Sequence, residues 1–185
     1  MLKDMQAKAE KEMRRAIEST VRGFNGVRTG RASLTLLDGL MVEAYGSTVP
    51  VNQVATLGVP ETRLITVQPW DASLLSAIER AILKSDLGVT PANDGKVVRI
   101  PIPSLTEERR KELVKVVRKI AEEGRVAVRN ARRDANEGLK RKEREKELSE
   151  DDVKKGLEII QSLTNRLISE VDELLAKKEK EIMEF

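Results

Sequence analysis

Arginine is concentrated in one short segment of the chain, residues 125–133. Arg125, Arg129 and Arg132 recur at i, i+4 and i+7, which places them on one face of a helix, and Arg133 flanks that face. The segment contains no acidic residue. Clustered guanidinium groups suit phosphate, because each planar fork can make paired hydrogen bonds to it. The spacing leaves two interpretations open: a phosphate-binding surface, or a solvated face that pairs with neighbouring carboxylates.

Charge is unevenly distributed along the chain, although the net charge is only +3. Residues 106–145 hold 14 basic and 9 acidic side chains, a balance of +5, whereas residues 31–104 hold 6 and 7, a balance of −1. Attraction to nucleic acid therefore has to come from local clustering. The aromatic side chains, which could stack on single-stranded bases, lie outside the arginine segment; they are Phe24, Tyr45, Trp70 and Phe185. This composition favours recognition of backbone and shape, as in structured RNA.

Two residue types on which many catalytic sites depend are missing. The chain has no Cys and no His, which excludes disulfides, thiol nucleophiles, imidazole bases and the usual zinc ligands. Adjacent carboxylates such as Glu122-Glu123 stand in solvated, helix-forming contexts, and the glycines at 23, 26 and 30 match no nucleotide-binding motif. We therefore expect a protein that is not an enzyme and that uses no cofactor, no metal and no small-molecule substrate.

The location of the protein is predicted from similar absences. A chain without Cys fits the reducing cytoplasm, and its first residues do not have the pattern of a secretory signal. No apolar run approaches the roughly 18 residues needed to span a bilayer. We expect a soluble, cytoplasmic protein with no membrane partner.

Three segments show the apolar periodicity of amphipathic helices. They cover residues 2–28, about 40 residues that follow an N-cap at Thr106, and about 35 residues that follow an N-cap at Ser149. The expected core stripe of the second helix is Leu113, Val117, Ile120, Gly124, Ala127, Ala131, Ala135 and Gly138. Its small residues would let a neighbouring helix come close. Because no helix can bury its stripe alone, we expect a long antiparallel three-helix bundle.

The middle of the chain, residues 31–104, is rich in Gly, Pro, Val and Thr. One helix is expected there, with Asp71 as its N-cap and with Gly88 just past its last residue, Leu87. Short strands are predicted at residues 40–45, 54–58, 64–69 and 97–101. The predicted fold class is α+β: residues 1–30 and 105–185 form the bundle, and residues 31–104 form a small inserted β/α/β domain.

Two segments join the inserted domain to the bundle, residues 29–31 and 101–104. Pro101 and Pro103 fix φ and bias their predecessors toward extended geometry, so the second segment is semi-rigid, while Gly30 gives the first one freedom. Because the inserted domain would hang from one end of the bundle by these two segments, we expect an elongated, bent molecule. The pairing of a stiff and a loose segment favours a hinge; an ordinary linker is the alternative. The hinge residues would be Gly30, Arg31, Pro101, Pro103 and Ser104.

Several motifs resemble the family signatures of ribosome recycling factors. They are Arg28-Thr29-Gly30-Arg31-Ala32-Ser33, Ser85-Asp86-Leu87-Gly88, the segment from Pro103 to Lys111 (PSLTEERRK) and the segment from Val126 to Ala135 (VAVRNARRDA). They occur in the family's order, and the resemblance covers nearly the whole chain. One departure is Ala44, where the family usually shows a second Tyr; Tyr45-Gly46 can still make the turn that follows.

The resemblance implies an L-shaped monomer whose small domain swings on the hinge. It also implies that the bundle binds ribosomal RNA of the large ribosomal subunit after termination. Elongation factor G then pushes on the small domain and hydrolyses GTP, which splits the post-termination complex into subunits. By the same resemblance Arg132 is the first-choice contact with ribosomal RNA, supported by Arg129 and Arg28, and Arg133 and Arg125 complete the predicted site.

Two other functions fit parts of the sequence. One is a coiled-coil structural or adaptor protein, which the return of three helices within one chain argues against. The other is a general RNA-binding chaperone, which would need a broad basic surface rather than a net charge of +3. A monomeric mass would exclude the first, and binding to large subunits but not to bulk RNA would exclude the second.

Overall fold

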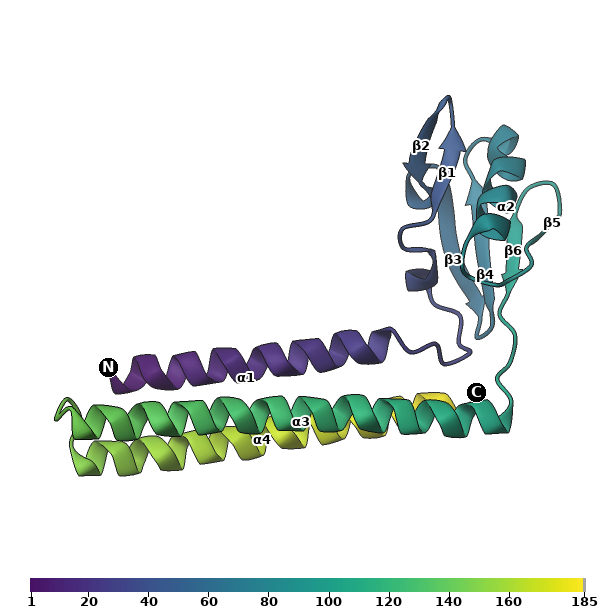
Figure 1. The fold of residues 1–185 in the computed structure, drawn as a ribbon. Helices are drawn as coiled ribbons and strands as arrows, with labels where there is room; N and C mark the ends of the chain where they lie inside the picture. The colour runs from purple at the N-terminus through teal and green to yellow at the C-terminus, as the bar shows by residue number, and fades with distance from the viewer. Residues whose placement is uncertain (185) are drawn as a thin grey trace. The chain divides into compact units, whose positions relative to one another are not determined.

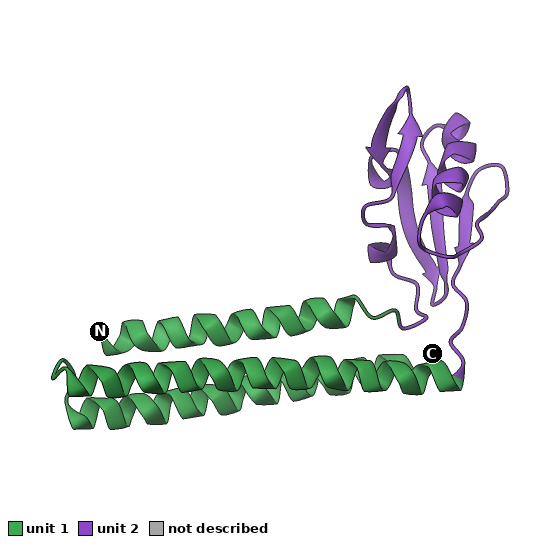
Figure 2. Cartoon of the chain, in the orientation of Figure 1, with its two compact units in different colours: residues 1–28, 107–184 green, residues 29–106, 185 purple. Residues whose placement is uncertain are grey.

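The computed structural model describes residues 1–184, which form two compact units (Figure 2). The first unit, here called the bundle, consists of Met1–Arg28 and Glu107–Glu184. The second unit, here called the module, consists of Thr29–Thr106. No helix in this part of the chain combines the length and the apolar character needed to cross a membrane.

The bundle consists of three long helices (Figure 1), α1 (Leu2–Asn25), α3 (Glu107–Arg144) and α4 (Glu150–Met183). α3 runs antiparallel to both α1 and α4. Ser149 caps α4 as predicted, because its Oγ accepts a hydrogen bond of 3.1 Å from the backbone N–H of Asp152. α3 begins directly after Thr106. The predicted three-helix bundle is confirmed.

The buried stripes of α1 and α4 follow the predicted periodicity, whereas that of α3 departs from the prediction. In α3 the prediction is right at Leu113, Val117 and Gly124 but wrong at Ala127, which is exposed, while Val128 is fully buried. After Gly124 a step of three or of four is possible, and the larger side chain gains more from burial. The other predicted members are only partly buried, and two further residues are buried instead; the former are Ile120, Ala131, Ala135 and Gly138, and the latter are Ala121 and Leu139. α1 buries Ala9, Met13, Ile17, Thr20 and Phe24, and α4 buries Val153, Gly156, Ile160, Thr164, Leu167, Val171 and Ile182.

Glycines allow the helices to approach closely. A Cβ on Gly124 of α3 would collide with the side chain of Thr20 on α1. Thr20 cannot easily turn away, because it is buried and its Oγ1 donates a hydrogen bond of 2.9 Å to the carbonyl oxygen of Ala16. A Cβ on Gly156 of α4 would likewise meet Leu139 at 2.9 Å. The prediction that small residues in the stripe permit close packing is confirmed.

α4 supplies charged partners to both of its neighbours. Ion pairs join it to α1 and to α3; they are Arg14–Glu170, Arg166–Glu10, Arg118–Glu179 and Arg125–Asp172. Most of these side chains are well exposed, so each pair adds little to stability. Their consequence is instead local, because each pair neutralises an arginine that could otherwise bind an anion.

The module contains two antiparallel sheets and one α-helix (Figure 1). β1 (Met41–Ala44) pairs with β2 (Ser47–Pro50). The second sheet has the order β3-β4-β6-β5, and its strands are β3 (Ala55–Glu61), β4 (Leu64–Pro69), β6 (Val98–Pro101) and β5 (Ala92–Asn93). Short 3-10 helices occupy Leu34–Leu37, Val51–Gln53 and Ala72–Leu74, and the last one leads into α2 (Leu75–Lys84). α2 packs against β1, β5 and β6 over an aliphatic core that includes Val42, Val67, Ile78, Ile82 and Val98.

The sequence missed the strands β2 and β5 and placed two helix ends too late. α2 was expected to reach Leu87 but ends at Lys84. There the Ser85 hydroxyl donates a hydrogen bond of 2.6 Å to the carbonyl oxygen of Ile82, which favours a turn over another helical residue. α1 was expected to reach residue 28 but ends at Asn25, where Gly26 follows. Glycine has a low helix propensity, so this is a natural place for the helix to stop.

Candidate nucleic-acid interface

Arg125 is largely committed to carboxylates of the bundle. Its side chain is only 19% exposed, and its Nη atoms lie 2.6 Å from Asp172 and 2.9 Å from Glu122. Partial burial opposes the charge, but the hydrogen bonds with Asp172 and Glu122 outweigh it and raise the pKa of Arg125. Hydrogen bonds from Arg125 and then Arg129 in turn lower the pKa of Glu122. Arg125 is therefore paired with carboxylates, as expected if the arginine face is a solvated face rather than a phosphate-binding surface.

Arg129 and Arg132 are held more loosely. Arg129 shares Glu122 with Arg125: its Nη1 lies 3.2 Å from Oε1, and its side chain is 42% exposed. Arg132 forms no ion pair with any residue from 1 to 184; its Nη1 donates a hydrogen bond of 3.3 Å to the amide oxygen of Gln161 on α4. An amide orients the guanidinium group without neutralising it. The positive charge of Arg132 is therefore available to an anion.

Arg133 is exposed beside this face. Among residues 1–184 no side chain forms a hydrogen bond or an ion pair with its guanidinium group. Arg129, Arg132 and Arg133 thus make up one cationic surface on α3, here called the arginine surface. Arg125 borders it but does not contribute free charge.

The facing part of α4 explains why the arginine surface remains uncompensated. Residues 159–169 of α4 contain no Asp or Glu, although acidic residues are frequent before and after them. Gln161, which accepts the hydrogen bond from Arg132, in turn donates one of 2.8 Å to Asn165. Sequence reasoning missed both residues. The sequence does show an acid-free stretch of about three helical turns in α4. It does not show the register of α4 against α3, so this stretch could not be placed opposite the arginines.

Arg28 does not join the arginine surface. It follows the end of α1, where Gly23 lies beside Ile120 of α3. Ile120 and Arg132 are 12 residues apart in one helix, which corresponds to roughly 18 Å along the axis. Of the five predicted contacts with ribosomal RNA, α3 therefore brings four onto neighbouring positions and leaves Arg28 at another level of the bundle.

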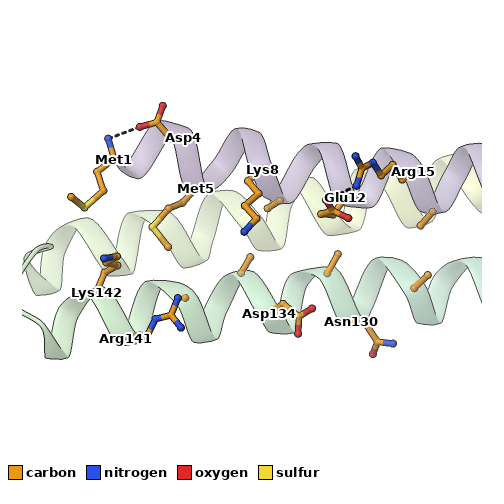
Figure 3. Close-up of a pocket in the computed structure, with 16 residues that line it drawn as sticks. Met1, Asp4, Met5, Lys8, Glu12, Arg15, Asn130, Asp134, Arg141 and Lys142 are labelled. Atoms are coloured by element: carbon orange, nitrogen blue, oxygen red, sulfur yellow. Dashed lines mark hydrogen bonds and ion pairs between the residues drawn. The ribbon is translucent and has the colours of Figure 1, made fainter.

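A groove of about 880 Å³ lies between α1 and α3, on the other flank of the core stripe (Figure 3). Its floor is made of small side chains, including Ala9, Ala131 and Gly138. Its rim carries both signs of charge, with Lys8, Arg15, Arg141 and Lys142 interspersed among Asp4, Glu12 and Asp134. Mixed charge suits a phosphate backbone less well than an uninterrupted cationic surface does. The arginine surface is therefore the better candidate for an RNA contact.

The predicted hinge residues lie in three different settings. Pro101 is the last residue of β6 and pairs with Leu64 of β4. Beyond it, the N–H of Ile102 donates a hydrogen bond of 2.8 Å to the carbonyl oxygen of Arg63, so the ordered sheet edge continues one residue further. Pro103 and Ser104 are exposed and follow this last sheet hydrogen bond.

The other connecting segment has a similar anchor. The N–H of Ala32 donates a hydrogen bond of 2.8 Å to the carbonyl oxygen of Thr62, in the same β3–β4 turn. Gly30 precedes it with φ of +75°, a conformation that favours glycine, and a Cβ there would also lie 3.0 Å from the side chain of Leu105. Both connecting segments are therefore tied to one turn of the module, at Thr62 and Arg63.

The family model described as ribosome recycling factor matches residues 20–183. The ribosome-recycling factor of Nitratidesulfovibrio vulgaris is 57% identical over 177 residues, which cover 96% of this chain and 95% of that protein. The ribosome-recycling factor of Syntrophomonas wolfei is 55% identical over 184 residues, which cover 100% of both chains.

Two solved structures are similar over nearly the whole chain. The solution structure of a ribosome recycling factor has a TM-score of 0.76 at 45% identity and covers 100% of this chain and 98% of its own. A Thermus thermophilus ribosome recycling factor, in models with Escherichia coli elongation factor G bound to the E. coli post-termination complex, has a TM-score of 0.64 at 48% identity, with 99% of each chain covered. Recycling factors are not enzymes, in agreement with the expectation from the sequence. The matched length and the identity of more than one half show that the chain belongs to the ribosome recycling factor family.

Proposed function

We propose that this protein binds the large ribosomal subunit after termination and splits the post-termination complex together with elongation factor G, which hydrolyses GTP. The observation that carries the proposal is the arginine surface of α3, opposite the acid-free part of α4. A solved relative whose title places it with elongation factor G and the post-termination complex supports the choice of partners. The protein would act as a monomer in the cytoplasm, and the chemistry of GTP hydrolysis would belong to the partner.

The contacts rank the predicted RNA-binding arginines. Arg132 comes first, because its one partner among residues 1–184 is the neutral amide of Gln161. Arg133 and Arg129 follow, since one is exposed and the other shares a single carboxylate. Arg125 would contribute least, because binding a phosphate would require it to give up Asp172 and Glu122. Arg28, which lies at another level of the bundle, would contact a different part of the ribosomal RNA.

The module would swing on the segments that precede Ala32 and follow Ile102. Hydrogen bonds to Thr62 and Arg63 tie these two residues to the sheet, so backbone rotation is easiest just outside them. On this proposal Gly30, Arg31, Pro103 and Ser104 form the hinge, whereas Pro101 fixes the edge from which it starts. Gly30 is the hinge residue most sensitive to substitution. A side chain there would be strained by the positive φ of the backbone and would also contact Leu105.

Co-sedimentation with isolated large subunits tests the RNA contact. Arg132→Ala should weaken binding by about ten- to a hundredfold, because a hydrogen bond to a charged group contributes about 1.5–3 kcal/mol. Its circular dichroism spectrum should not change, since the side chain supports no core contact. Arg166→Ala is the matched control: it removes an exposed arginine of the same bundle, 62% exposed and paired with Glu10.

The control should bind like the wild-type protein. If Arg132→Ala also binds normally at physiological salt, Arg132 is not part of the interface. If both variants lose affinity equally, binding depends on overall charge and not on the arginine surface.

A further inference from the structure

The two aromatic side chains of the module are both exposed and both held in place. Tyr45 is 75% exposed and Trp70 is 68% exposed. The Tyr45 hydroxyl donates a hydrogen bond of 2.7 Å to Asp71, and Trp70 Nε1 donates one of 2.9 Å to Thr56. Asp71 directly follows Trp70 and also accepts a hydrogen bond from the N–H of Ser73. The pairs Tyr45–Asp71 and Trp70–Thr56 thus lie at one end of β4, next to each other in the chain, and are here together called the aromatic platform.

Tyr45 occupies a position that a bulky residue rarely adopts. Ala44 pairs with Ser47, so Tyr45 and Gly46 form a two-residue turn, and their φ angles are +50° and +77°. Positive φ at both positions is typical of a type I′ turn, which favours Asn, Asp or Gly. An aromatic residue in this conformation is strained, and such strain is often found at functional sites. A side chain kept there in spite of the strain points to a role outside folding.

The platform lies at the end of the module remote from the connecting segments. β4 starts beside Arg63, in the turn that binds Ala32 and Ile102, and it ends at Pro69, next to Trp70. Seven residues of extended chain separate Arg63 from Trp70, which corresponds to roughly 23 Å. A force applied at the platform would therefore act on the connecting segments with a long lever arm.

The charge around the platform is negative. The platform contains one charged side chain, Asp71, and Glu43 lies two residues before Tyr45 on β1, whereas Glu61 and Arg63 both lie at the β3–β4 turn, at the opposite end of β4. Of the other cations of the module, Arg31 lies in the first connecting segment, and the rest, beginning with Arg80, lie in α2 and around β5 and β6. Asp71 stays ionised at neutral pH, since the hydrogen bonds from Tyr45 and Ser73 lower its pKa. A phosphate backbone would be repelled here, whereas a basic protein surface would be attracted.

We propose that the aromatic platform is a protein-docking surface that receives an arginine or lysine of the partner beside an apolar side chain. Tyr and Trp are prominent among residues that dominate binding energy, and a cation gains both from aromatic faces and from Asp71. The inference rests on the proposed function and makes it specific: elongation factor G would engage the module at this remote end. RNA, which could also stack on aromatic rings, is disfavoured by the acidic surroundings.

Splitting of post-termination complexes by the full-length protein with elongation factor G and GTP, followed by light scattering, tests the platform. Trp70→Ala should slow splitting by at least about tenfold, as expected for a central interface aromatic. Tyr45→Asn should slow it as well without lowering the melting temperature, because Asn tolerates the turn better than Tyr. The matched control is Leu83→Ala, which removes an equally exposed apolar side chain, 61%, from α2 of the same module.

The control should stay within about twofold of the wild-type rate, as for most surface changes. All three variants should bind isolated large subunits normally when elongation factor G is absent. Wild-type rates for both Trp70→Ala and Tyr45→Asn would overturn the proposal, as would an equal loss with Leu83→Ala. Loss of subunit binding without elongation factor G would also overturn it, because the platform would then face the ribosome. A wild-type protein that splits no complexes would overturn the proposed function itself, and the platform with it.

Discussion

The bundle and the module present different chemistry to a partner. On the bundle, residues 106–145 carry a balance of +5, and the arginine surface contains no aromatic side chain. On the module, residues 31–104 carry a balance of −1, and two aromatic side chains, Tyr45 and Trp70, are exposed next to Asp71. Cationic surfaces bind phosphate, whereas anchored aromatics bind proteins. If both proposals hold, a single chain of this size carries two recognition surfaces that do not compete for the same kind of partner.

The two units also differ in how they are packed. The bundle brings helices together through glycines, as at Gly124 against Thr20, and its charged rim pairs across helices. The module relies on a small core of aliphatic side chains under two sheets. Each unit thus has a core of its own, which makes it possible to change one and leave the other intact.

Deleting the module should have the largest effect. Replacing residues 31–104 by a Gly/Ser linker should leave a folded bundle that binds large subunits but supports no splitting. The linker must be long, because the two helix ends are not level with each other. Gly23 of α1 lies beside Ile120 of α3. α1 ends two residues after Gly23, whereas α3 begins 13 residues before Ile120. The two ends are therefore roughly 16 Å apart along the axis, and about ten flexible residues span this distance. Co-sedimentation and light scattering measure the two outcomes.

The deletion can contradict the comparison in two ways. An unfolded product would mean that the bundle needs the module for stability. A bundle that still splits ribosomes with elongation factor G would mean that the module is not what the partner acts on.

The next largest effect is expected from salt, which should weaken binding through the arginine surface. If Arg129, Arg132 and Arg133 neutralise phosphates, the logarithm of the affinity for large subunits should fall with that of salt, with a slope between about −2 and −3. From 50 to 200 mM salt the affinity would fall about sixteen- to sixtyfold. Arg132→Ala should reduce the slope by nearly one, whereas Arg125→Ala should hardly change it, since Arg125 is already neutralised. Equal slopes for both variants would show that ion pairing within the bundle does not decide which arginines bind RNA.

A third prediction concerns the close contact in the bundle. Gly124→Ala should lower the free energy of unfolding by about 1–2 kcal/mol, because overpacking against Thr20 outweighs the better helix propensity of Ala. Gly138→Ala is the matched control: its Cβ would meet only the flexible end of Met5, at 3.2 Å. The control should be neutral or stabilising. Urea denaturation of both variants gives the sign, and a stabilised Gly124→Ala would mean that the helices are not held by this contact.

Much of the fold could be predicted from the sequence, because long periodic helices carry a strong local signal. Local reasoning failed where a choice depended on another part of the chain. Val128 rather than Ala127 is buried because α1 and α4 pack against the side of α3 that carries Val128. β2 and β5 are short strands with little apolar alternation, and they exist because partner strands pair with them.

The arginine surface shows the same limit at the level of function. The sequence located the arginines, and even Glu122, one turn away, could have been foreseen as a partner. Asp172 lies 47 residues from Arg125, so the ion pair that removes this arginine from the surface depends on the register between α3 and α4. The absence of carboxylates opposite Arg132 depends on it too. Charge clusters can be read locally, but their compensation cannot.

The smallest effect is expected at Lys146, which contrasts with Tyr45 of the module. These two are the only non-glycine residues among 1–184 with positive φ, and Lys146 has φ of +58°. Lys146 follows the end of α3. Its N–H donates a hydrogen bond to the carbonyl oxygen of Glu143, and the N–H of Glu147 donates one to the carbonyl oxygen of Lys142. In this helix-ending pattern the position of Lys146 is usually occupied by Gly. Lys146→Gly should therefore raise the free energy of unfolding by up to about 1 kcal/mol, because relief of strain exceeds the entropy that Gly adds to the unfolded chain. Ribosome binding and splitting should not change, whereas Tyr45→Asn, which relieves the same strain in the module, should lose splitting. If Lys146→Gly also impairs splitting, positive φ marks function at both sites, and the contrast between a strained helix end and a strained docking residue is wrong.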